Sequence, residues 1–156
     1  MIVVPDTGPL DYLLWIEAVD LLPQVYGAVV IPDAVHQELS HPNAPERGRL
    51  WAASLPGWVS VRTPYLPLTL PVDIGEQEAI SLAVEIQADL ILVDDHRGRE
   101  AAEAQGLIVT GTLGVLGQAA GLGLVDLEDA LERLRQTNFR ASPKVISALF
   151  AKFRGG

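Results

Sequence analysis

The 156-residue sequence contains no cysteine. Disulfide bonds, cysteine-ligated zinc and thiol catalysis are therefore excluded, and the composition suits a reducing cytoplasm. The N-terminus has no basic segment leading into an apolar run and a cleavage site, so we expect no signal peptide and a cytoplasmic location. Basic residues are also scarce, with 11 Lys and Arg against 20 Asp and Glu, a formal net charge of −9. By charge alone the chain is not an obvious nucleic-acid binder, so its acids either surround a metal or face a basic partner.

The few basic residues are concentrated at the C-terminal end. All 20 acidic residues precede position 133, and the same part of the chain holds five basic ones. The remaining basic residues form a tail without any acid: Arg133, Arg135, Arg140, Lys144, Lys152 and Arg154. This tail predicts either a landing surface for an anionic partner or a contact with the acidic part of a neighbouring molecule.

One long uncharged stretch, residues 104–125, requires a membrane test. A spanning helix needs about 20 mostly apolar residues, but this stretch contains six glycines together with two Gln and two Thr. We therefore expect a buried strand, a turn and a packed helix here, and no membrane association.

Apolar segments alternate with helix-forming segments along the chain. Strands are predicted at residues 2–4, 28–32, 57–61, 89–95 and 107–111, with helices between them and two amphipathic helices near the C-terminus. This alternation is typical of βαβ units, so the predicted fold class is α/β, a three-layer α/β/α sandwich with a central parallel sheet. We expect a single domain over residues 1–156, with the C-terminal helices and basic tail in residues 126–156.

Acidic side chains fall where a parallel sheet would bring them together. Asp6 ends the first strand, and Asp94 and Asp95 end the fourth. Glu38 lies on the helix after the second strand, and Glu76 with Glu78 opens the helix before the fourth. In open α/β sheets, ligands bind outside the carboxyl ends of the strands. Any one of these acids alone could simply cap a helix or lie in a surface turn, but the whole set predicts a site.

Crowded carboxylates repel one another, and a hard divalent cation such as Mg²⁺ relieves that repulsion through oxygen ligands. A metal held in this way can activate water and bind a phosphate for in-line displacement. The acids therefore predict phosphodiester chemistry, in which an acidic protein can act on an acidic substrate.

Other interpretations of the same residues fit less well. Asp6-Thr7-Gly8 spells the triplet of retroviral-type aspartic proteases, but those need an all-β chain and a second copy, and a helix-forming segment follows here. A haloacid-dehalogenase-type phosphatase needs a second aspartate at position 8, which is Gly8. The three histidines lack paired zinc spacing.

The order of several motifs resembles a known family. After a strand and "DTG" come "IPDAVHQEL", "GEQEAISLA", "LILVDDHRGREAA" and "VTGTLGVL". This order is similar to that of prokaryotic PIN-domain proteins, closest to a VapC-like subgroup with a "GE-x-EAI…DD-x-x-GR…GT-x-G-x-L" pattern. The resemblance runs from Ile2 through most of the chain. It implies an endoribonuclease that cleaves single-stranded RNA with Mg²⁺ or Mn²⁺, often the toxin of a type II toxin–antitoxin pair.

The resemblance also implies site residues and partners. The implied catalytic residues are Asp6, Glu38, Glu78 and Asp94, and the implied metal ligands add Asp95; Glu76 is the alternative to Glu78, and the local pattern does not separate Asp94 from Asp95. Arg97 and Arg99 are candidates for binding the substrate phosphate. The implied partners are single-stranded RNA, a cognate antitoxin protein and a second copy in a homodimer. The family usually has Ser or Asn where this chain has Gly8, which leaves open an RNA- or partner-binding module that does not cut.

Overall fold

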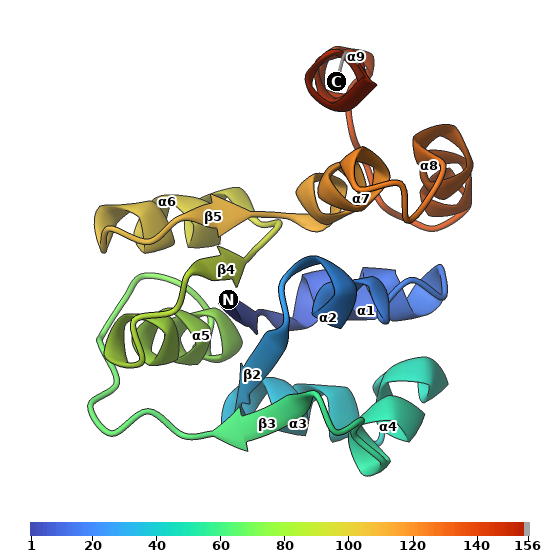
Figure 1. The fold of residues 1–156 in the computed structure, drawn as a ribbon. Coiled ribbons are helices and arrows are strands. Elements are labelled where there is room, and N and C mark those ends of the chain that lie inside the picture. The colour runs from blue at the N-terminus through green and yellow to red at the C-terminus, as the bar shows by residue number, and fades with distance from the viewer. Residues whose placement is uncertain (155–156) are drawn as a thin grey trace.

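A five-stranded parallel sheet forms the centre of the computed structural model, which describes residues 1–154 (Figure 1). Its strands are β1 (Ile2–Pro5), β2 (Ala28–Pro32), β3 (Val59–Arg62), β4 (Leu90–Leu92) and β5 (Val109–Thr110). The order across the sheet is β3-β2-β1-β4-β5, and every neighbouring pair is parallel. From β1 the chain adds strands first on one side and then, with β4, on the other, so the order reverses between β1 and β4.

Nine helices of the described chain surround this sheet. They are α1 (Thr7–Trp15), α2 (Leu21–Val25), α3 (Asp33–Ser40), α4 (Glu46–Ala53), α5 (Ile74–Glu85), α6 (His96–Ala104), α7 (Thr112–Gly121), α8 (Leu127–Arg135) and α9 (Pro143–Arg154). The predicted strands and helices are all present, and the proline-rich connection between β3 and α5 contains no further strand or helix.

Alternate strand residues face two separate hydrophobic clusters. Val3 belongs to a cluster with residues of α1, α3, α7 and α8, whereas Val4 belongs to one with residues of α5 and α6. Leu92 and Ile91 divide in the same way between the two clusters. Side chains on a strand point alternately to the two faces, so helices cover both sides of the sheet. This arrangement confirms the predicted three-layer α/β/α fold.

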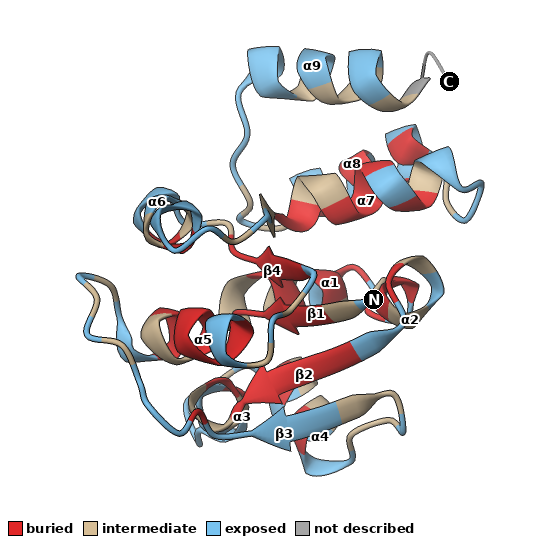
Figure 2. Ribbon diagram, turned by 60° about the vertical axis from the view of Figure 1, so that its left-hand side comes forward, coloured by how far each residue is buried: buried red, intermediate tan, exposed pale blue. Residues whose placement is uncertain are grey.

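The two C-terminal helices extend the layer that contains α7. Helix α8 buries Leu127, Leu131 and Leu134 against the larger cluster. Helix α9 lies along α7, where the Phe153 ring occupies the space that a Cβ on Gly117 would need. Figure 2 shows that the outward side of α9 is exposed. The uncharged stretch contains a strand, β5, and a packed helix, α7, as predicted, but β5 is half-buried and not buried as expected. Across residues 1–154, no helix combines the length and apolarity needed to cross a bilayer.

The buried Tyr26 provides a stability test. Among the residues described, its Oη is buried without a hydrogen-bond partner, and burial raises the pKa of Tyr26 to about 12. A buried, unpaired polar group costs about 1–3 kcal/mol. We expect Tyr26→Phe to raise the free energy of unfolding by about 1 kcal/mol, measured by urea denaturation. A lower stability would mean that the hydroxyl has a partner in solution.

Candidate active site

Asp6 lies at the point where the strand order reverses. It directly follows β1, and its backbone N–H donates to the Leu92 carbonyl of β4 at 2.9 Å. It is also the N-cap residue of α1, and the residue is only 8% exposed. The pairing with β4 therefore fixes the backbone of Asp6 at the strand edge where the sequence predicted a site.

Glu76, and not Glu78, accompanies Asp6 at this edge. Glu76 lies in the first turn of α5 and is 6% exposed, and its N–H donates to the N-cap side chain of Asp73 at 2.8 Å. The carboxylate of Glu78 points elsewhere, because its Oε1 accepts from the Ala34 N–H in the first turn of α3 at 3.1 Å. The positions of the two side chains therefore favour Glu76, which the motif had given only as the alternative to Glu78. Residues two apart on a helix point about 200° apart, so only one of the two can face this edge.

Glu38 reaches the same edge from α3. The Thr7 Oγ1 donates to Glu38 Oε2 at 2.6 Å, which holds this otherwise exposed side chain beside the start of α1. Glu38 is among the charges that raise the pKa values of Asp6 and Glu76. Three of the predicted acids, with Glu76 in the place of Glu78, are therefore electrostatically coupled.

Asp94 and Asp95 have different surroundings. Asp94 is half-buried, and its two oxygens accept from the N–H and the Oγ1 of Thr112 at 2.8 and 2.6 Å. Burial raises the pKa of Asp94, while the hydrogen bonds from Thr112 and the nearby Arg99 oppose the shift. Asp95 is exposed, caps α6 through the Gly98 N–H at 3.1 Å, and contributes to the raised pKa of Glu76. Asp95 is thus electrostatically coupled to Glu76, whereas Asp94 is held by Thr112 beside this group of acids.

The site disfavours full ionisation. Burial, followed by the charges of Glu76, Asp73 and Glu38, raises the pKa of Asp6 to about 7, against a smaller lowering by a hydrogen bond from the Thr7 backbone. Burial and the charges of Asp73, Asp95 and Glu38 raise the pKa of Glu76 to about 7. At neutral pH these two carboxyls are therefore only partly ionised unless a positive charge joins them.

Three glycines of the motif pattern leave the space in which these carboxylates lie. A Cβ on Gly98 would come 2.9 Å from Glu76 Oε2, and one on Gly111 would come 2.5 Å from Asp94 Oδ1. A Cβ on Gly75 would collide with the Glu38 carboxylate. The glycines of "GE", "GR" and "GT" therefore each accommodate an acid from a different segment.

Of the two predicted phosphate-binding arginines, only Arg99 lies beside the acids. Its Nη1 donates to the Val93 carbonyl at 3.3 Å, and its charge acts on Asp94. Arg97 is exposed and lines a different hollow, with Leu70 and Pro71. The position of Arg97 therefore does not match the predicted role.

The sequence analysis missed two residues of the site. Asp73 was not singled out, although Asp73 and Glu76 have the three-residue spacing of a helix N-cap pair. Thr112 follows the fifth predicted strand and therefore falls at the same sheet edge, but it was missed because only acidic residues were considered there. Both residues act on a carboxylate, since Asp73 fixes the start of α5 and Thr112 holds Asp94.

The donor chemistry fits a hard divalent cation. All the candidate donors are carboxylate oxygens, the donors that Mg²⁺ and Mn²⁺ prefer. A cation would offset the cost of burying these charges and their repulsion, which together raise the pKa values of Asp6 and Glu76. Within residues 1–154, no group of three or more such side chains is arranged to hold a metal ion as it stands. Metal binding therefore requires rotation of carboxylate side chains such as the exposed Glu38 and Asp95.

The fold and this acidic edge define an α/β protein of the nuclease type. The chain belongs to the PIN-domain family DUF3368, whose model matches residues 2–154. The fold is similar to a solved PilT N-terminus domain protein, SSO1118, from the hyperthermophilic archaeon Sulfolobus solfataricus P2. That similarity has a TM-score of 0.54 at 16% identity and covers 91% of this chain and all of the other. A search among curated proteins gave no match.

The raised pKa of Asp6 makes stability depend on pH. A carboxyl with a raised pKa in the folded state stabilises the fold when protonated, and that contribution is lost as the pH rises from about 4 through about 7. Asparagine caps a helix as well as aspartate does but carries no charge. We therefore expect Asp6→Asn to be the more stable protein at pH 8, by up to about 4 kcal/mol, with the difference shrinking towards pH 4.

The measurement is urea unfolding of both proteins across this pH range in the presence of a chelator. A stability difference that stays constant with pH would contradict the electrostatic origin of the shift.

Proposed function

We propose that the protein is a metal-dependent endoribonuclease that cleaves single-stranded RNA. The observation that carries the proposal is the buried Asp6–Glu76 pair, with both pKa values raised to about 7, next to Glu38 at the carboxyl ends of β1 and β4. Buried acids with raised pKa values that lie close together are typical of functional sites. A PIN-domain chain with this edge is best explained by phosphodiester chemistry.

The residues divide between those that would hold the cation and those that position them. Asp6, Glu76, Glu38 and Asp95 are the proposed ligands for Mg²⁺ or Mn²⁺, with Asp94 on the neighbouring side of the site. A cation held there would supply the positive charge that lets an anionic phosphate approach and that lowers the pKa of water. Thr7 orients Glu38, and Thr112 orients Asp94 through two hydrogen bonds. Arg99 provides a fixed cation for a phosphate oxygen beside Asp94.

The wider role that we propose is that of a toxin in a type II toxin–antitoxin pair, acting as a homodimer. Support comes from the VapC-like order of "GE-x-EAI", "DD-x-x-GR" and "GT-x-G-x-L" along the chain. A small DNA-binding protein encoded beside this one would support the toxin role, as its antitoxin.

A second candidate is a PIN-fold module that binds RNA or a protein partner without cutting. The observation that favours it is Gly8, the residue after Asp6-Thr7, where the resemblance leads us to expect Ser or Asn. Nothing lies within 4 Å of the position that a Cβ would take on Gly8. Packing therefore does not require glycine here, and the missing hydroxyl or amide is a chemical difference close to Asp6.

Cleavage assays on matched variants test the first proposal against the second. We expect single-stranded RNA to be cut in Mn²⁺ or Mg²⁺ and to stay intact with a chelator. Asp6→Asn and Glu76→Gln should each reduce the rate by more than about a hundredfold, since even the outer partners of metal ligands are worth about 10- to 100-fold. Each change removes charge and keeps the shape of the side chain.

Glu78→Gln is the matched control, because it removes the same charge two residues along the same helix. Its rate should stay within a few-fold of the unchanged protein. If Glu78→Gln abolishes cutting and Glu76→Gln does not, the assignment of the third acid is wrong. If varied RNAs stay intact in Mn²⁺ while the protein still binds RNA or a partner, the second candidate replaces the first.

A further inference from the structure

A groove of about 680 Å³ joins the acidic edge to the C-terminal part of the chain. One wall holds Asp94, Asp95 and Arg99. The opposite wall is the segment that connects α8 to α9, residues 136–142, which we name the strap. The volume lies within the range of about 300–1,000 Å³ typical of sites for small ligands, and is therefore suited to part of a single strand.

The strap is fixed to the body of the protein from a distant part of the sequence. The Tyr12 Oη of α1 donates to Asn138 Oδ1 at 2.7 Å. The rings of Tyr12 and Phe139 meet edge to face, with centroids 5.0 Å apart. The Thr137 hydroxyl also donates to the last turn of α8, at the Leu134 carbonyl and 2.6 Å. The strap is thus held at Thr137, Asn138 and Phe139.

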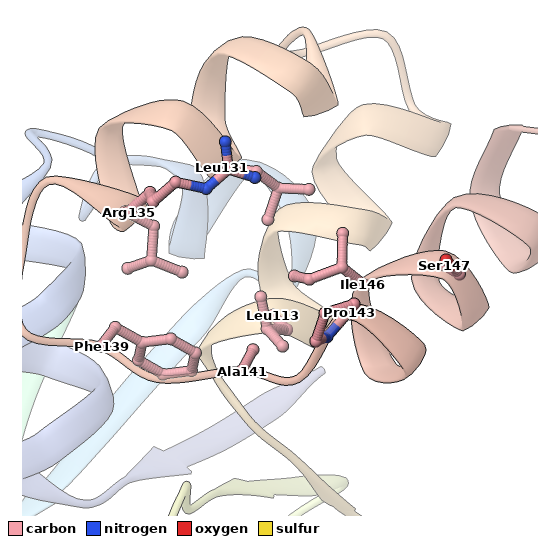
Figure 3. Close-up of a pocket in the computed structure, with 9 residues that line it drawn as sticks. Leu113, Leu131, Arg135, Phe139, Ala141, Pro143, Ile146 and Ser147 are labelled. Atoms are coloured by element: carbon pink, nitrogen blue, oxygen red, sulfur yellow. The ribbon is translucent and has the colours of Figure 1, made fainter.

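An apolar cavity lies on the other side of the strap. Figure 3 shows Phe139 and Ala141 of the strap facing Leu113, Pro143 and Ile146 across this cavity. Leu113, Phe139 and Ala141 line the groove as well. The strap therefore separates the groove from the cavity. Its position depends mainly on its hydrogen bonds and ring contacts, because a cavity lies behind it.

The cations of the groove come from both walls. Arg99 stands on the acidic side and bonds the Val93 carbonyl. Arg140 stands on the strap, is exposed, and forms no ion pair with any of the described residues. Two arginines that line the same groove suit a chain of phosphates, and an arginine without an acidic partner among the described residues remains available to bind one.

We propose that the strap forms the outer wall of the RNA-binding groove and that Arg140 binds a backbone phosphate next to the one that is cleaved. Tyr12 and Asn138 are positioning residues that hold the strap at the distance required by the RNA backbone. This inference rests on the proposed ribonuclease function and adds to it a defined path for the strand, from the acidic edge along residues 138–142.

Salt-dependent binding tests the role of Arg140. The probe is a short fluorescein-labelled single-stranded RNA of mixed sequence, titrated with full-length Asp6→Asn protein so that no cutting occurs. Each phosphate contact adds about 0.7 to the slope of log K against log salt for single strands. We expect Arg140→Ala to weaken binding about tenfold and to flatten this slope by about 0.7.

Lys144→Ala is the matched control, because Lys144 is an exposed cation of the same tail that does not line the groove. It should change neither affinity nor slope by a comparable amount. Equal effects of the two variants would overturn the inference in favour of a diffuse basic tail, while leaving the nuclease proposal intact. If the parent protein neither binds nor cuts RNA, the proposed function fails and this inference fails with it.

Steady-state cleavage by the otherwise unchanged protein tests the positioning role of Tyr12. We expect Tyr12→Phe, which keeps the ring and removes the bond to Asn138, to raise KM about three- to tenfold, the size of one neutral hydrogen bond. It should leave kcat unchanged, because the acids keep their places. Tyr26→Phe makes the same chemical change far from the groove and should alter neither constant. An unchanged KM in Tyr12→Phe would refute the positioning role.

Discussion

The burial of carboxylates close to one another, at the carboxyl ends of β1 and β4, is the constraint on which the rest of this structure depends. Asp6 and Glu76 are almost fully buried, and their pKa values rise to about 7 because water is excluded and other acids are close. The fold keeps them in place through the sheet pairing of Asp6 and the helix cap of Glu76. A cation is the simplest group that makes such an arrangement favourable at neutral pH.

The glycines around the site follow from the same constraint. Carboxylates from three segments can converge only if the backbone beside each of them lacks a Cβ, and Gly75, Gly98 and Gly111 meet this condition. Their positions in the sequence pattern are therefore as informative as the acids themselves. Three of the acids, Glu38, Glu76 and Asp94, each lie beside a glycine from another segment. The motif therefore specifies these acids and the glycines that make room for them.

The sequence was sufficient to predict the strands, the layers and the edge at which the acids gather, because strand alternation and strand ends follow directly from local patterns. It was not sufficient to choose between Glu76 and Glu78. That choice depends on the rotation of α5 about its axis, which is fixed by the Asp73 cap and by packing against the sheet. The sequence could not choose between Arg97 and Arg99 for a similar reason. Only the orientation of α6 shows that Arg99 is the one that lies beside Asp94.

The groove wall could not have been read from the sequence at all, because Tyr12 and Asn138 are 126 positions apart. This separation also orders events during protein synthesis. Every acid from Asp6 to Asp95 is made before Asn138, so a growing chain carries its carboxylates before it has the wall that we propose for the RNA groove.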